Sequence, residues 1–191
     1  MKLYHGTTVT KGDQILKSGI IDGFAKGNYD DSDPDYTTTK GFVYLTPDPV
    51  YAYYYAQFQS IFFEESRDYA MIFEVEVDNS KLEPDFDELM MVARYSKEEV
   101  LKATVSESLE MANSIRVAGI LLLESDVKRY STFPLQTNRT FSKADRDILM
   151  RFASQRETKK LTQEDRNHFN RLVIFNHLCE KKPTIKGVHG T

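Results

Sequence analysis

The chain has 191 residues, of which 40% are hydrophobic and 12% aromatic, and this suffices for one compact core of single-domain size. It contains no run near the roughly 20 apolar residues that a membrane-spanning helix requires, and its polar start lacks a signal-peptide core, so we expect a cytoplasmic protein with no membrane association. A single cysteine, Cys179, and four scattered histidines predict neither a disulfide framework nor a metal site.

The net charge of -4 is unevenly distributed along the chain. Residues 1–141 carry 14 Lys/Arg against 23 Asp/Glu, whereas residues 142–191 carry 11 against 6, so the balances are -9 and +5. A basic tail on an acidic body fits an acidic or nucleic-acid partner, and it fits equally well a tail that docks on its own body.

The beginning of the chain predicts a strand, a tight turn and a short helix. The strand ends at His5, and Gly6 permits a close backbone approach or an unusual φ beside the imidazole. Thr10 and Asp13 are candidate caps for the helix, and Gly19 is a candidate C-terminal stop. The segment predicts a pocket floor that carries a histidine, although the same pattern also fits a histidine that is only a satisfied polar group.

Residues 22–40 predict a long loop, because they are rich in Gly, Asp, Pro and Thr and show no helical or strand period. Loops of this length inside a compact domain are usually lids, binding loops or disorder. A cover over the His5 pocket is therefore one hypothesis, with Tyr29 and Tyr36 as its contact residues.

Residues 41–46 predict a strand that runs directly into a helix. Asp48 can cap this helix, and Pro49 suits its first position. The spacing of five aromatic residues predicts one buried helix face, formed by Tyr51, Tyr54, Tyr55, Phe58 and Phe62. Because a buried tyrosine needs a partner for its hydroxyl, at least one of them is expected to line a wet cleft.

Two further strands are predicted. Residues 71–78 alternate between apolar and acidic side chains, which places Met71, Phe73, Val75 and Val77 on one face. Residues 115–123 predict a strand with a kink at Gly119, although so apolar a run also fits a buried helix.

The remaining segments predict helices. Residues 85–112 indicate two or three short helices, two of them with capping boxes that pair Ser96 with Glu99 and Thr104 with Glu107. The tail predicts two amphipathic helices, one that starts near Ser142 and one that starts near Thr162.

Several short motifs follow one another in this order. His5-Gly6-Thr7 is followed by Ile15, Leu16 and Gly19, then by the strand Gly41-Phe42-Val43-Tyr44 and, eleven residues later, by Tyr55. With the Glu-Val-Glu-Val strand after them, these motifs resemble the ADP-ribosyltransferase superfamily of the diphtheria-toxin and poly(ADP-ribose) polymerase type. The resemblance implies an α+β fold with two antiparallel sheets around an NAD cleft. It covers residues 1–135 and leaves a basic helical C-terminal extension, residues 136–191.

The resemblance also implies roles for single residues. Tyr44 and Tyr55 would sandwich the nicotinamide ring, and the backbone N–H and C=O of Gly6 would reach its carboxamide. His5 would bind a hydroxyl of the adenosine ribose. The NAD-binding set that follows from the resemblance is His5, Gly6, Thr7, Tyr44, Ala52 and Tyr55.

The third element of the family motif, a glutamate at the start of a late strand, has no direct match here. The corresponding strand is 115–117, which puts Ser114 in the place of the glutamate. Glu110 lies four residues upstream, and Glu124 or Asp126 would serve in another register. His5, Tyr44, Ser114 and Glu110 are thus the candidate catalytic residues.

The resemblance implies transfer of one ADP-ribose unit from the co-substrate NAD to a macromolecular acceptor, either protein or nucleic acid, with release of nicotinamide. Breaking that glycosidic bond requires stabilisation of a cationic sugar and a positioned nucleophile, and it requires no metal. Two alternatives stay open. The chain could be a non-catalytic module that binds NAD or ADP-ribose, or it could resemble the RNA 2'-phosphotransferases, which carry a histidine where Tyr44 stands.

Overall fold

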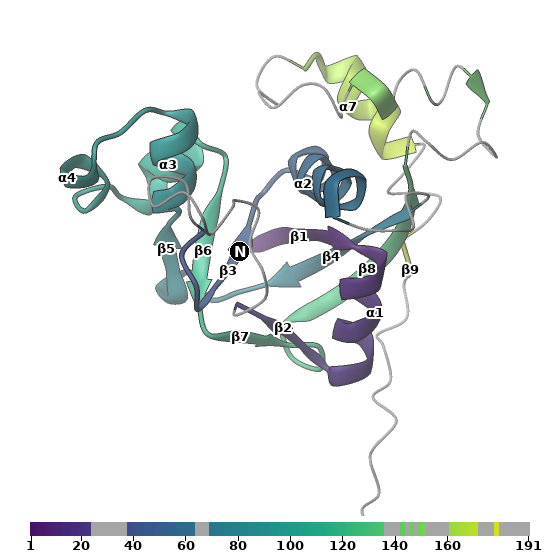
Figure 1. Cartoon of the computed structure of the whole chain (residues 1–191), viewed down its shortest axis with the longest axis horizontal. Coiled ribbons are helices and arrows are strands. Elements are labelled where there is room, and N and C mark those ends of the chain that lie inside the picture. Colours follow the sequence, from purple (N-terminus) through teal and green to yellow (C-terminus); the bar gives the residue numbers. More distant parts are fainter. Residues whose placement is uncertain are drawn as a thin grey trace, which may run out of the picture.

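The protein has an α+β fold built from small antiparallel sheets and several helices (Figure 1). The computed structural model describes residues 1–23, 38–63, 69–135, 142–143, 146, 149–151, 161–171 and 178–179. The loop prediction for 22–40 therefore lies mostly outside the described residues, together with Tyr29 and Tyr36.

The described strands form three sheets, all antiparallel. The largest has the order β1 (Lys2–Thr8), β4 (Tyr69–Glu76), β8 (Val127–Pro134) and β9 (Leu178–Cys179). The second has the order β3 (Phe42–Leu45), β6 (Ile115–Ala118) and β5 (Leu82–Pro84). The third pairs β2 (Ile20–Asp22) with β7 (Ile120–Leu122).

The third sheet differs from the expectation of two sheets, and Gly119 explains the difference. Its φ of 84° bends the chain between β6 and β7, so the end of the predicted strand leaves β3 and pairs with β2. The kink predicted at Gly119 is confirmed, and the alternative of a buried helix is wrong.

The first two sheets are joined at one point. Tyr4 of β1 and Thr46, directly after β3, exchange two backbone hydrogen bonds of 2.8 and 3.0 Å. Past this bridge the described residues of β1 and β3 no longer pair. The two strands separate there, and this separation creates the pocket described below.

Helix α1 (Val9–Ser18) is capped two residues before the first of its two predicted caps. Its N-cap is Thr8, whose extended backbone lets its hydroxyl accept a hydrogen bond from the Lys11 amide at 3.3 Å, so Thr10 and Asp13 are not the cap. Gly19 ends the helix in the left-handed conformation, with φ 79°, as predicted.

Helix α2 (Pro49–Phe63) starts where predicted, because Asp48 accepts a hydrogen bond from the Val50 amide at 2.9 Å. Its predicted buried face is wrong. Tyr51 is buried, but Tyr54, Tyr55 and Phe58 are only half-buried, and the Phe62 side chain lies outside the described part. The helix instead buries Val50, Ala52, Tyr53, Ala56 and Ser60.

Strand β4 lies at the centre of the molecule, between helices on both faces. Figure 1 shows α2 on one side of β1 and β4 and α1 on the other. The predicted apolar face of Met71, Phe73 and Val75 is confirmed. On the opposite face Ile72 is also buried, against α2, which one-sided alternation did not predict.

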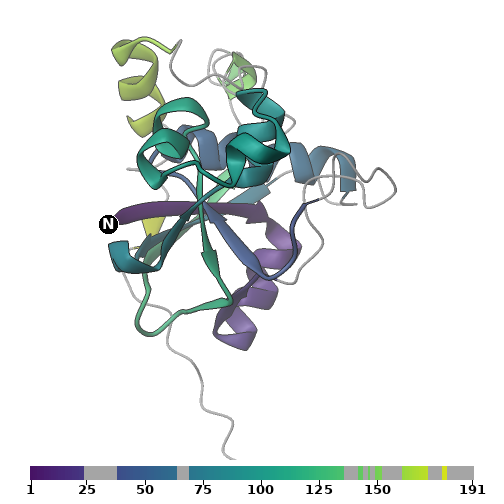
Figure 2. The ribbon, with the colours of Figure 1, turned by 90° about the vertical axis from the view of Figure 1, so that its left-hand side faces the viewer.

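Four short helical segments lie between β4 and β6. They are a 3-10 turn (Asn79–Lys81), α3 (Phe86–Val92), α4 (Lys97–Val100) and α5 (Val105–Met111). Both predicted capping boxes are present, at Ser96 with Glu99 and at Thr104 with Glu107. Figure 2 shows α3, α4 and α5 grouped together in front of α2, with the 3-10 turn apart from them on the side of the N-terminus.

The described part of the C-terminal segment packs on the outer side of α2. Helix α7 (Gln163–Phe169) has the predicted start, with a capping box at Thr162. Leu149, Leu161 and Phe169 share one buried cluster with Tyr53 of α2. Arg166 of α7 also forms an ion pair with Asp48, the cap of α2. None of the helices in the described part of the chain is long and apolar enough to cross a membrane.

Candidate functional site

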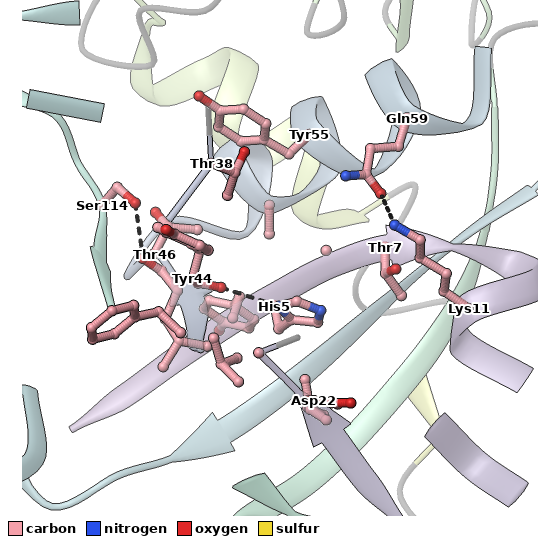
Figure 3. Close-up of a pocket in the computed structure, with 18 of the residues that line it drawn as sticks. His5, Thr7, Lys11, Asp22, Thr38, Tyr44, Thr46, Tyr55, Gln59 and Ser114 are labelled. Carbon is pink, nitrogen blue, oxygen red and sulfur yellow. Dashed lines mark hydrogen bonds between the residues drawn. The ribbon is translucent and has the colours of Figure 1, made fainter. Parts of the chain in front are cut away.

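A cavity of about 340 Å³ opens where β1 and β3 separate (Figure 3). Its walls come from β1, α1, β3, α2 and the start of α3, and from Ser114 just before β6. The volume falls in the range of pockets that hold small ligands. His5, Gly6, Thr7, Tyr44, Ala52, Tyr55 and Ser114 all line it. Seven of the eight site residues predicted from sequence are thus brought together.

His5 links the two separating strands. Its Nδ1 lies 3.1 Å from the Tyr44 carbonyl oxygen. A carbonyl oxygen can only accept a hydrogen bond, so Nδ1 carries the proton and Nε2 is an acceptor in the neutral ring. Burial lowers the pKa of His5, and the charge of Lys11 lowers it further. The imidazole is therefore neutral near pH 7 and can accept a hydrogen bond from a ligand hydroxyl.

Gly6 is required by packing as well as by access. A Cβ at this position would lie 1.9 Å from the Ala52 carbonyl oxygen of α2, so only glycine allows the helix to lie this close to β1. Tyr4 directs its N–H and C=O toward β3, and Gly6, two residues later, directs its own toward the same edge. Among the described residues no strand pairs with that edge at Gly6. Its backbone donor and acceptor therefore face the cavity.

Tyr44 and Tyr55 enter the cavity from different elements. Extending the Tyr4–Thr46 register places Tyr44 of β3 across the strand separation from Gly6. The Tyr44 hydroxyl lies 2.5 Å from an Asp87 carboxylate oxygen and 2.8 Å from the Thr39 carbonyl oxygen. Tyr55 projects from α2, and Figure 3 shows it on the side of the cavity opposite Asp22.

Three acidic side chains from the start of α3 line the cavity, and sequence reasoning missed them. Asp85, Asp87 and Glu88 are 3, 5 and 4% exposed. Asp87 accepts from Tyr44, and Glu88 accepts from the Tyr51 hydroxyl at 2.6 Å. One signal in the sequence could have indicated them: Asp85, followed three residues later by Glu88, is the pattern of a helix start, and it comes directly after a strand.

Arg116 of β6 keeps α3 against the sheet. Its guanidinium lies between the rings of Phe42 and Phe86, 3.8 and 4.3 Å from their centroids, and it pairs with Glu83 at 3.5 Å. Phe86 is the first residue of α3. This contact therefore fixes the helix turn that carries the three acids.

Ser114 is buried beside Asp85. Its hydroxyl lies 2.5 Å from Asp85 Oδ2, and Asp85 Oδ1 accepts the Glu88 amide at 3.0 Å as the cap of α3. Burial raises the pKa of Asp85 to about 7, and the charge of Glu88 adds to the rise, while the hydrogen bond from Ser114 opposes it.

The other acids proposed for the third element do not line the cavity. Glu110 lies exposed on α5, and Glu124 lies exposed in the turn after β7. Asp126 is used within the same turn, where it accepts the Leu122 amide at 2.8 Å. Of the four candidates, only Ser114 reaches the cavity, and Ser114 has no carboxylate of its own.

The two ends of the cavity carry different charged groups, and Asp22 of β2 adds a carboxylate to its lining. Figure 3 shows Ser114 at one end and Lys11 at the other. The acids of α3 lie near Ser114, whereas the Lys11 ammonium donates to Gln59 Oε1 at 3.2 Å beside Thr7. Among the described residues, no group of three or more histidines, cysteines and carboxylates could hold a metal ion.

A scan of protein-family models and a search of curated proteins find no match to this chain. The chemistry of the cavity is therefore the basis for a functional assignment.

Proposed function

We propose that the cavity binds NAD and that the protein is a mono-ADP-ribosyltransferase of the diphtheria-toxin and poly(ADP-ribose) polymerase type. The acceptor would be a protein or a nucleic acid, and nicotinamide would be the leaving group. The observation that carries the proposal is the separation of β1 from β3, which puts the Gly6 backbone, a neutral His5 and the tyrosine Tyr44 around one opening.

The nicotinamide end of NAD fits the Tyr44 end of the cavity. A flat ring with a carboxamide needs aromatic faces and a paired backbone donor and acceptor, and Tyr44, Tyr55 and Gly6 offer these. The ring is cationic until its glycosidic bond breaks, and the acids of α3 supply negative charge at this end. The same charge favours the cationic sugar that forms in the transition state.

The remainder of NAD fits the other end. Nε2 of His5 can accept a hydrogen bond from a ribose hydroxyl, which is a positioning role that uses no proton transfer. The Lys11 ammonium suits the negative diphosphate, and Gln59 steadies it there. A dinucleotide with one cationic and one anionic portion thus matches a cavity with opposite charges at its two ends.

A non-catalytic module for NAD or ADP-ribose is the second candidate, and Ser114 favours it. A hydroxyl at the place of the family glutamate cannot by itself accept the proton of an acceptor at neutral pH. The RNA 2'-phosphotransferase alternative is less well supported, because those enzymes have a histidine where this chain has Tyr44.

Calorimetry with NAD tests the binding site, and nicotinamide release from NAD tests the activity. Tyr55→Ala should weaken NAD binding by roughly 1–2 kcal/mol, because one stacking face is lost. Tyr55→Phe keeps that face and is the matched control. Unchanged NAD affinity in both Tyr44→Ala and Tyr55→Ala would overturn the assignment. NAD binding with no nicotinamide release would leave the binding module as the function.

A further inference from the structure

We propose that Asp85, acting through the Ser114 hydroxyl, accepts the proton of the incoming nucleophile, so that this pair takes the place of the glutamate that the chain lacks. The inference rests on the proposed NAD-dependent transfer. It assigns a residue from the start of α3 to the reaction, in contrast to the acids near β6 that the sequence offered.

The first support is the geometry of the pair. Ser114 Oγ lies 2.5 Å from Asp85 Oδ2, within the range of a hydrogen bond to a charged carboxylate. Both residues line the cavity and are nearly buried, at 6 and 3% exposure. A proton that leaves Ser114 therefore has one short path, to Asp85.

The second support is the position of Ser114 in the strands. The β3–β6 register pairs Leu45 with Ile115, so Ser114 lies opposite Thr46, the residue that bridges to β1. Its hydroxyl is also 3.4 Å from the Leu45 carbonyl oxygen. Ser114 therefore lies next to the strand separation, opposite the position two residues after Tyr44 along the chain.

The third support is that the two neighbouring acids are committed elsewhere. Both Asp87 oxygens accept hydrogen bonds from Thr39, at 2.7 Å each, and one also accepts from Tyr44. Glu88 accepts from Tyr51. Of the three, only Asp85 is linked to the residue that stands at the family's third position.

The reaction balances without a further reactant. The glycosidic bond between C1' of the ribose and the nicotinamide nitrogen breaks, and its electron pair leaves with nicotinamide, which becomes neutral. A lone pair of the acceptor oxygen forms the new bond to C1'. The acceptor proton passes to Ser114 Oγ as the Ser114 proton passes to Asp85, and nothing is oxidised or reduced.

The pH dependence follows from this assignment. Asp85 must be ionised to accept a proton, and burial raises its pKa to about 7. For the free enzyme, kcat/KM should rise with pH through that value and level off above it. An ordinary carboxylate, with a pKa near 4, would give no such rise in this range.

The test measures nicotinamide release from NAD, with water as acceptor, across this pH range. Asp85→Asn preserves the helix cap, because asparagine caps as well as aspartate does. It should lower kcat about 100-fold or more, leave KM for NAD unchanged and abolish the rise with pH. Ser114→Ala removes only the relay hydroxyl and should have the same effect. Glu98→Gln, an exposed acid on α4, is the control and should match wild type.

The outcomes separate this inference from the proposed function. Wild-type turnover and pH profile in folded Asp85→Asn or folded Ser114→Ala would overturn the relay and leave the transferase assignment standing. If Asp85→Asn does not fold, the Ser114→Ala result decides. A wild-type protein that releases no nicotinamide would overturn the proposed activity, and the relay with it.

Discussion

Replacing Gly6 by alanine tests the close contact that shapes the cavity. The new Cβ would lie 1.9 Å from the Ala52 carbonyl oxygen, where contacts under 3.0 Å essentially never occur. β1 and α2 must therefore move apart by about 1.1 Å, and because the clash is with backbone atoms, no change of rotamer relieves it.

Two effects should follow from this displacement. Overpacking of this kind costs about 1–3 kcal/mol. For a chain of this length each kcal/mol lowers Tm by about 2–4 °C, so Gly6→Ala should melt about 2–12 °C below wild type. The shift also moves Tyr55 and Ala52 relative to β1. A misplacement of about 1 Å can reduce a rate roughly a hundredfold, so nicotinamide release should fall more than the stability loss explains.

Gly119→Ala is the matched control for stability. Gly119 has φ 84°, with no heavy atom within 4 Å of an added Cβ, and it does not line the cavity. Backbone strain there should cost about 1–2 kcal/mol and leave NAD binding intact. Calorimetric melting and NAD titration of both variants distinguish the two effects. Wild-type Tm and NAD affinity in Gly6→Ala would refute the close-packing explanation, and equal loss of affinity in both variants would refute its link to the cavity.

Three further predictions concern other parts of the molecule. Lys11→Met should weaken binding of NAD and of ADP-ribose by about 1.5–3 kcal/mol and leave nicotinamide binding unchanged, and calorimetry with the three ligands checks this. Phe169→Ala should destabilise the fold by about 3–5 kcal/mol, because this ring is 0% exposed and packs against Tyr53 and Phe133. Urea denaturation measures the loss, and wild-type stability would show that the α7 contact is dispensable. Burial acts to raise the pKa of Glu74, but hydrogen bonds from Arg129 and Lys2 outweigh it and hold the pKa below its ordinary value of 4.5. The stabilisation from Glu74 is therefore present above pH 4.5 and is lost as the pH falls through the lower pKa of the folded protein. Acidification should therefore lower the Tm of Glu74→Gln less than it lowers the Tm of wild type.

Local signals allowed much of the fold to be predicted. Both capping boxes, the Gly19 stop and the Asp48-Pro49 helix start depend on residues within a few positions of each other, and all are present. The Gly119 kink likewise depends on the backbone freedom of one residue.

Features that depend on distant segments could not be predicted in this way. The prediction of the buried face of α2 was wrong because the helix is covered on two sides, by the large sheet and by Leu149, Leu161 and Phe169, and the aromatic spacing alone does not indicate the second cover. Asp85 and Ser114 are 29 positions apart, and only the pairing of β5 with β6 brings them into contact. The sequence points to acids near Ser114 along the chain, whereas the carboxylate that contacts Ser114 in the structure is that of Asp85.

The cover over α2 also has a consequence for synthesis of the chain. Phe133 belongs to the same buried cluster, and Phe169, which packs against it, follows 36 residues later in the chain. At ribosomal rates this interval is about two to seven seconds. During that time the native cover of α2, to which Leu149, Leu161 and Phe169 contribute, is incomplete. The nascent protein therefore exposes apolar surface on which a chaperone can act before α7 closes the core.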